Sequence, residues 1–197
     1  YSEKKYKDYS VYSTKIFFTV LFLSVVACTP LYFNSNYYIE LVFGYSDKFS
    51  YSDMEIMSNY LRIYSLTIPF QGVNSLLISS LSAQKKPIYP LISSLSCMLL
   101  FLLASLFIAN NVVDVFSCLL VSLVCSSFLL IYFCLKSKAL VFTLSDFIAS
   151  LPFLIIAILY GIVTQFKFGG DFIILYDATG FLLCFLASLY SIRYLGR

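Results

Sequence analysis

Long apolar runs separated by short polar stretches make up most of this 197-residue chain. A helix needs about 20 residues, at a rise of 1.5 Å each, to cross the ~30 Å hydrocarbon layer of a bilayer. Six runs approach that length, so the pattern predicts an all-α, polytopic membrane helix bundle with about six transmembrane helices. The expected spans are Ile16–Phe33, Tyr60–Ala83, Ile88–Ala109, Val112–Leu135, Ser145–Gln165 and Phe172–Tyr190.

The same pattern divides the chain into four parts. These are a polar segment at 1–15, a four-span membrane bundle at 16–135, a connector at 136–144, and two further membrane helices with a tail at 145–197. The connector is apolar enough to lie along the membrane interface. No connecting segment is long enough to form the core of a soluble domain.

Composition supports a membrane protein and excludes other classes. The chain is 60% hydrophobic and 12% charged, with a mean hydropathy of +0.89, whereas soluble domains are about 25% charged. The net charge of +3 is small and no dense basic run occurs, so nucleic acid is not expected as a partner. The chain is predicted to be embedded in membrane lipid.

The basic residues fall unequally on the two sides of the predicted membrane. With six spans, both ends of the chain lie on one side, and the positive-inside rule makes that side cytoplasmic. We therefore expect a multi-pass protein of the cytoplasmic (inner) membrane with both ends of this chain in the cytoplasm. The cytoplasmic set would be Lys4, Lys5, Lys7, Lys15, Lys85, Lys86, Lys136, Lys138, Arg193 and Arg197, against Lys48, Arg62 and Lys167 outside.

Signatures of enzymes, metal sites and cofactor sites are missing from the sequence. There is no histidine, and the six cysteines all fall in apolar stretches, where a thiol behaves as a small hydrophobic group. No nucleophile elbow, phosphate-binding loop or dinucleotide-binding loop is found. Asp47, Asp53 and Glu55 are expected to be solvated loop carboxylates, and no acid is expected deep in the bundle. We predict a protein that is not an enzyme, with no catalytic residue, metal or cofactor.

The second predicted span carries the candidate functional residues. Pro69 and Gly72 mark a kink or hinge, because proline removes a backbone hydrogen bond that another group must replace. Gln71 and Asn74 beside them either join helices together or line a polar substrate pathway. Arg62 near the outer end either reaches the headgroups or faces a cavity and attracts an anionic substrate.

Two further features of the spans have structural readings. Lys85 and Lys86 are expected to hold a short cytoplasmic loop, with binding of lipid phosphates as a secondary reading. The serines of the second and third spans are expected to pack at helix interfaces, where small residues allow close approach. They are Ser75, Ser79, Ser80, Ser82, Ser93, Ser94 and Ser96.

Residues 38–90 resemble the lipid II flippase (MurJ/MviN) family of the multidrug/oligosaccharidyl-lipid/polysaccharide exporter superfamily. The matching elements are Phe43-Gly44, then Phe49 and Asp53, then the segment Tyr60–Phe70 and the segment Ala83–Pro87. They correspond to the family's LFGxGxF…D, YxLGLPF and A…DTxTP elements. Thr67 stands where the family usually has glycine, and Gln84-Lys85-Lys86 replaces the family's GDT. These departures leave the related O-antigen and capsule flippases open.

The resemblance implies a fold and a function. The fold would be the C-terminal portion of two pseudo-symmetric bundles around a central cavity, with the helices at 145–165 and 172–190 as a final pair that forms an apolar groove. The function would be flipping of an undecaprenyl-diphosphate-linked glycan, such as lipid II, by alternating access. The partners would be membrane lipids, this lipid-linked glycan and an N-terminal bundle of the same longer chain, which would carry the diphosphate-binding arginines.

Three alternatives to a lipid II flippase remain. The first is a flippase for O-antigen or capsular polysaccharide repeat units, and the second is a drug/cation antiporter, which needs an acid inside the bundle. The third is a membrane scaffold or enzyme of polysaccharide synthesis.

Overall fold

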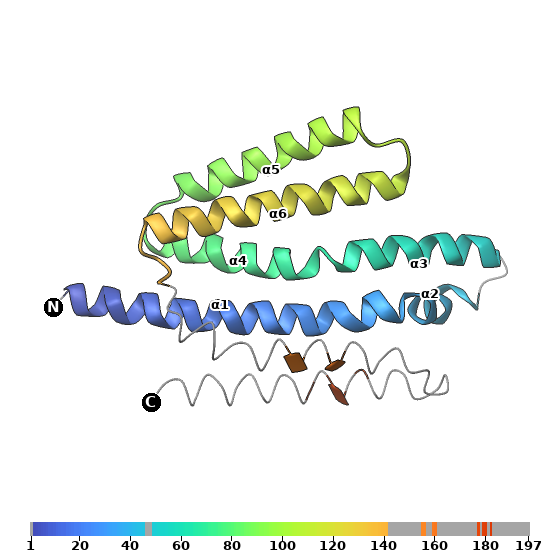
Figure 1. The fold of residues 1–197 in the computed structure, drawn as a ribbon, viewed down its shortest axis with the longest axis horizontal. Coiled ribbons are helices and arrows are strands. Elements are labelled where there is room, and N and C mark those ends of the chain that lie inside the picture. Colours follow the sequence, from blue (N-terminus) through green and yellow to red (C-terminus); the bar gives the residue numbers. More distant parts are fainter. Residues whose placement is uncertain are drawn as a thin grey trace.

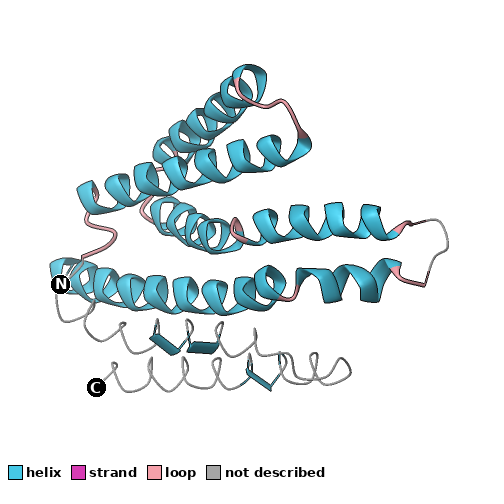
Figure 2. Ribbon diagram, turned by 45° about the vertical axis from the view of Figure 1, so that its right-hand side comes forward, coloured by secondary structure: helices cyan, strands magenta, loops and turns pink. Residues whose placement is uncertain are grey.

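The computed structural model describes residues 2–45 and 49–141, together with residues 155, 156, 159, 160, 177, 179, 180 and 182. Every regular element in these ranges is a helix (Figure 2), which confirms the predicted all-α class. The predicted fifth and sixth spans, as continuous segments, lie outside the described residues, as do Asp47, Lys48, Lys167 and the two C-terminal arginines. Six helices, α1 to α6, make up the described bundle.

The first two helices form one long rod with a break. Helix α1 (Ser2–Phe33) begins well before the predicted span and continues through Pro30, and α2 (Ser35–Phe43) follows after Asn34. The polar start of the chain is therefore helical, because its lysine-rich sequence has good helix propensity and can extend out of the apolar layer. Within α1, the stretch Ser10–Phe33 is long and apolar enough to cross a membrane.

The predicted second span is two helices. Helix α3 (Tyr51–Ser65) starts nine residues before the predicted boundary of Tyr60, and α4 (Ile68–Ala83) ends at the predicted residue. Because of the break, neither helix is by itself long enough to count among the described helices that could cross a membrane. The early start follows from a capping box, in which the Ser50 hydroxyl accepts from the Asp53 amide at 3.2 Å and the Ser50 amide donates to the Asp53 carboxylate at 3.0 Å. The acids expected in a loop, Asp53 and Glu55, therefore lie in the first turns of α3, where both are exposed.

The remaining helices agree closely with the predicted spans. Helix α5 (Ile88–Phe107) and helix α6 (Val112–Lys136) each end within two residues of the expected boundary, and both are long and apolar enough to cross a membrane. Asn111 and Asp114 form a second capping box at the start of α6. The tight turn between the two helices therefore has a local cause in the sequence.

The helices form a layered bundle in which α4 is central (Figure 1). Helix α1 packs along α4, α4 packs on α6, α3 lies between α2 and α6, and α5 packs almost entirely on α6. A buried apolar cluster joins α1, α4 and α6 near the ends of α4 and α6. Its buried members are Phe17, Val73, Leu77, Leu81, Leu130, Cys134, Ala139 and Leu140.

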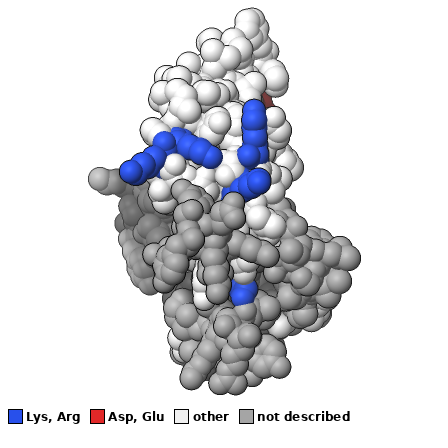
Figure 3. Space-filling model, turned by 90° about the vertical axis from the view of Figure 1, so that its left-hand side faces the viewer, with Lys and Arg blue, Asp and Glu red and all other residues white. Residues whose placement is uncertain are grey.

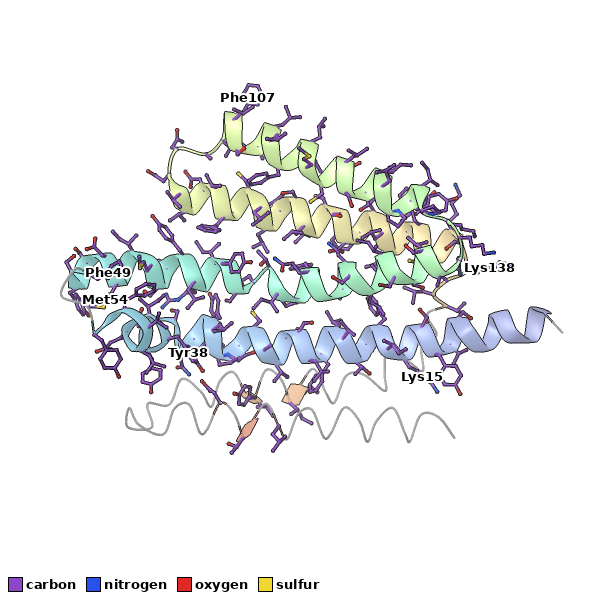
Figure 4. All side chains as sticks on the ribbon, turned by 180° about the vertical axis from the view of Figure 1, so that it is seen from behind. Lys15, Tyr38, Phe49, Met54, Phe107 and Lys138 are labelled. Carbon is purple, nitrogen blue, oxygen red and sulfur yellow. The ribbon has the colours of Figure 1, made fainter. Side chains whose placement is uncertain are left out.

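Two helices end in the same way at this end of the bundle. Lys85 after α4 and Lys138 after α6 have φ values of 57° and 59°, and the next residue's amide bonds back to Leu81 and Cys134, respectively. Both ends are Schellman motifs with a lysine at the left-handed position that usually holds glycine. Together with Lys86 and Lys136, these lysines gather on the face shown in Figure 3. Lys15 lies toward the same end as Lys138 (Figure 4).

The serines of α4 and α5 divide between interface and surface. Ser80 bonds Ser13 of α1 at 3.2 Å, and Ser93 bonds Ser126 of α6 at 2.8 Å, so these two pack between helices as predicted. Ser75, Ser79, Ser82 and Ser94 are exposed and do not pack between the described helices.

Candidate functional site

The long helix of α3 and α4 breaks at Leu66–Thr67 (Figure 2). Pro69, at the start of α4, has no amide hydrogen, so it cannot donate to the Ser65 carbonyl one turn earlier. The two residues before α4 form tighter turns instead, with Leu66 N bonded to Ile63 O at 3.2 Å and Thr67 N to Tyr64 O at 2.9 Å. The predicted interruption is present and lies on the N-terminal side of Pro69.

Side-chain hydroxyls satisfy backbone carbonyls at this break. The fully buried Ser65 hydroxyl donates to the Arg62 carbonyl at 2.8 Å, and the fully buried Thr67 hydroxyl donates to the Tyr64 carbonyl at 2.7 Å. This pattern is the one that allows a membrane helix to be interrupted. Thr67, the residue that replaces the family's glycine, keeps a right-handed backbone with φ −77° and adds a hydrogen bond that glycine could not make.

The structure places Gln71 and Asn74 in different surroundings. Gln71 is exposed, and its amide nitrogen donates to the Thr67 hydroxyl at 3.1 Å. Asn74 is 8% exposed, and its carbonyl oxygen is a buried acceptor with no hydrogen-bond partner in the described part of the chain. The two side chains therefore do not form one polar pair: Gln71 supports the break, while Asn74 is packed between helices.

Gly72 is a contact point between α4 and α1. A Cβ built on Gly72 would collide with the Ser24 hydroxyl of α1. That hydroxyl is already committed to the Val20 carbonyl, at 2.7 Å. Gly72 therefore lets the two helices approach closely just below the break.

The exposed face of α4 is polar along its whole length. Gln71, Ser75, Ser79 and Ser82 follow one another at intervals of three and four residues, which places them on one side of the helix. The remaining exposed residue of α4 is Ala83. On α5, by contrast, Ser94 is the one polar residue among the exposed positions, and the others are Leu, Ile, Met and Phe.

The predicted cationic residues lie away from the packed core. Arg62 is in the last turn of α3 and half-buried, and it forms no ion pair with any residue that the structure describes. Its charge faces the negative end of the α3 dipole, which is favourable. Lys85 and Lys86 lie in the short turn between α4 and α5, as predicted from sequence.

A buried acid was missed. Asp177 is 5% exposed and accepts hydrogen bonds from Asn34 and Tyr38 at the α1–α2 junction, and from Tyr160. The expectation that no acid lies deep in the bundle was therefore wrong. A lone aspartate within the apolar run 172–190 was a readable signal, because ionisable residues inside membrane spans are rare and functional by default.

The described residues contain neither a metal-binding cluster nor a disulfide. Within them, no group of three histidine, cysteine or acidic side chains comes together to hold a metal ion. The five described cysteines are all free thiols. The site consists of a helix break and a polar helix face. The polar face can contact a polar solute, and the break allows the angle between α3 and α4 to change.

Comparisons with known proteins agree with one another. The family model MatE matches residues 1–107, more than half of the chain. The solved structure "Lipid II flippase MurJ, inward closed conformation" superposes with a TM-score of 0.75 at 22% sequence identity. The alignment covers 97% of this chain and 41% of that chain, so the present chain spans less than half of the flippase's length. No curated protein sequence matches the chain.

Proposed function

The chain belongs to the MatE family and has the all-helical fold of a MurJ-like transporter; from this we propose that it is part of a flippase for undecaprenyl-diphosphate-linked glycans. Lipid II is the first candidate substrate, and an O-antigen or capsular repeat unit is the alternative. The flippase would work by alternating access, without covalent chemistry and without a cofactor.

The contrast between α4 and α5 carries this proposal. Exposed serine and glutamine side chains face lipid tails less cheaply than leucine does, so the exposed face of α4 suits water or another polar surface better than it suits lipid tails. The exposed face of α5 suits hydrocarbon. Helix α4 would therefore line a hydrated pathway for the glycan and diphosphate, while the lipid tail stays in the bilayer.

The helix break and the charged residues would serve the same pathway. The break at Leu66–Thr67 permits α3 and α4 to change angle, with Pro69 preventing their fusion into one helix. Arg62, at the end of α3, would attract the anionic diphosphate.

The rest of the transporter would come from a second bundle. Because this chain spans 41% of the matched flippase, an N-terminal bundle of the same protein would cover the polar face of α4 and close the cavity. The lysine-rich end of the bundle would be cytoplasmic by the positive-inside rule, in the inner membrane.

Flipping of lipid-linked glycan by the full-length protein in proteoliposomes tests the proposal. Replacing Gln71, Ser75 and Ser79 by leucine should lower the rate by about tenfold or more, because the pathway loses its polar wall. The matched control is Ser94→Leu on α5, which should flip at the normal rate. Normal flipping by the triple variant would remove α4 from the pathway.

A cation antiporter is the second candidate function, and Asp177 is the observation that favours it, since such a transporter needs an acid inside the bundle. Flipping without any antiported solute would support the flippase. Solute efflux without flipping, by the same preparation, would support the antiporter.

A further inference from the structure

Helix α1 continues past the break between α3 and α4 without ending (Figure 1). On one side of the break, Gly72 of α4 lies against Ser24 of α1. On the other side, the side chains of Cys28 in α1 and Ser65 in α3 are hydrogen-bonding neighbours. The short stretch of α1 between these two contacts therefore lies beside the break.

Both helices lack one backbone hydrogen bond at this level. Pro30 of α1 has no amide hydrogen for the carbonyl of the fully buried Val26, and Pro69 has none for the Ser65 carbonyl. Sharp bends in helices occur where proline removes such a bond. Two positions that can bend thus lie side by side, and these four residues define what we call the hinge level.

Apolar side chains hold the bundle together on the lysine-rich side of the hinge level. The buried residues of α4 include Val73, Leu77 and Leu81, which belong to one cluster with Phe17 of α1 and Leu130 of α6. Side chains of this size make many van der Waals contacts, so a change in their packing is costly. This side of the bundle is expected to keep its arrangement.

The other side is packed differently. Helices α2 and α3, which we call the distal unit, lie side by side there (Figure 1). The buried residues of the distal unit are all serines, namely Ser35, Ser58 and Ser65. Serine makes far fewer van der Waals contacts than leucine, and segments with few buried apolar contacts open at the lowest free energy. The distal unit is therefore the part of the described bundle that moves most easily.

Helix α6 spans both sides without a break, and its sequence contains no proline. The Cys134 thiol lies 3.9 Å from the Leu77 carbonyl of α4. Near the other end of α6, the Phe116 ring lies 5.7 Å and 6.0 Å from the rings of Tyr60 and Tyr64 in α3. The aromatic contact with the distal unit can open while the contact with α4 stays closed.

We propose that the distal unit is a gate that swings about the hinge level, while α4, α6 and the first part of α1 keep their positions. Helices α2 and α3 move together, because the Phe43 and Phe49 rings, 4.9 Å apart, join the end of α2 to the segment that enters α3. The Tyr38 hydroxyl of α2 donates to Asp177 at 2.6 Å, so Asp177 follows the gate. That the gate controls access to the polar face of α4 rests on the proposed function; the motion itself does not.

Distances between pairs of spin labels test the motion in the full-length protein, reconstituted in proteoliposomes with its native cysteines replaced. Labels at Tyr51 and Val112, exposed at the starts of α3 and α6, should give a two-peaked distance distribution. Labels at Ala83 and Lys136, exposed at the ends of α4 and α6, should give one narrow peak. A single narrow peak for both pairs would overturn the proposal.

Restoring the two missing amides tests the hinge level. Pro30→Ala combined with Pro69→Ala lets both helices form their hydrogen bonds, so the pair on α3 and α6 should lose its second peak. The matched control is Pro90→Ala in the first turn of α5, where proline costs no helical hydrogen bond. The control should keep both peaks. Two peaks in the double variant would overturn the assigned hinge.

A short, cleavable thiol cross-linker tests the role in transport. Linking Tyr60→Cys to Phe116→Cys ties the gate to α6 and should lower flipping by about tenfold or more until the linker is cleaved. Linking Ser13→Cys to Ser80→Cys, whose native hydroxyls are 3.2 Å apart on the other side of the hinge level, should change flipping by less than about twofold. Equal effects of the two links would overturn the gate. The spin-label distances involve no glycan, so they stand even if the flippase proposal fails.

Discussion

Gly72 of α4 lies directly against Ser24 of α1, with no room for a Cβ between them. The Ser24 hydroxyl that fills this space donates to Val20 of its own helix. The next nearest atoms, Ser24 Cβ and Val20 Cγ1, would be 3.5 Å from an added Cβ, which is an ordinary contact distance. One hydroxyl group therefore decides whether position 72 must be glycine.

This contact predicts that Gly72→Ala has opposite effects on the free energy of unfolding when residue 24 is serine and when it is alanine. Gly72→Ala should lower the free energy of unfolding by about 1 kcal/mol, because Ser24 must turn away and lose its hydrogen bond. In a Ser24→Ala background, the same substitution should raise it by roughly 0.5–1 kcal/mol, because alanine is the better helix former. Thermal unfolding in detergent measures both, and equal effects in the two backgrounds would contradict the assigned contact.

The lysines at the two Schellman ends make a second prediction. Lys85→Gly and Lys138→Gly should each raise the free energy of unfolding by about 0.5–1 kcal/mol, since glycine adopts a positive φ without the steric cost. The control is Lys136→Gly in the last turn of α6, which should lower it by about 1 kcal/mol. Equal decreases in the free energy of unfolding for Lys85→Gly and Lys136→Gly would show that the charge of Lys85 contributes more to stability than relief of its positive φ does.

Asp53 should make the start of α3 sensitive to acid. The hydrogen bond from the Ser50 hydroxyl, followed by that from the Ser50 amide, holds the pKa of this carboxyl below its ordinary value of about 3.9. A lowered pKa in the folded state adds stability above pH ~4, and that stability is lost as the pH falls through the lower value.

Comparison with Asp53→Asn across pH isolates this effect. The unmodified protein should be the more stable of the two at neutral pH, and the difference should shrink as the pH drops below ~4. A difference in melting temperature that stays constant over the whole range would mean that the carboxylate charge contributes nothing.

The polar face of α4 predicts a pattern of solvent access. In full-length protein whose native cysteines have been replaced, Ser75→Cys and Ser79→Cys should react quickly with a membrane-impermeant thiol reagent, because thiolate formation needs water. Leu95→Cys and Leu99→Cys, exposed on α5, should stay unreactive in the bilayer. Equal reactivity at the two helices would place both against lipid or both against water.

The parts of the fold that depend on local signals could be predicted from the sequence. Helix α6 starts and ends where the pattern places it, since Asn111 and Asp114 cap one end and an apolar run of suitable length follows. The start of α3 was missed although Ser50 and Asp53 form the same type of cap. Apolar length dominated the prediction there, and it detects only the part of a helix that enters lipid.

The candidate site could not be predicted in full, because hydrophobic periodicity does not tell which polar side chains are buried or which of them meet. Serine can bond a carbonyl of its own helix, as Ser79 bonds Ser75 at 2.9 Å, so its presence does not reveal whether it faces a helix, water or lipid. Only the packing of α4 on α1 and α6 separates the buried Ser80 from the exposed Ser79. The three donors to Asp177 lie 17 to 143 residues away in sequence, and no single-sequence pattern joins them.

Helix α5 is attached to the rest of the bundle almost solely through α6, and it turns leucine and other apolar side chains outward along its full length. As the lipid-facing helix of the proposed flippase, α5 would be where the lateral pressure and the thickness of the surrounding bilayer act on the protein. A membrane that is too thin or too thick would tilt the α5–α6 hairpin as a unit. Helix α6 packs directly on α4 and contacts α3 through Phe116, which lies against Tyr60 and Tyr64. Lipid composition would therefore change the angle between α3 and α4 without any contact between lipid and these two helices.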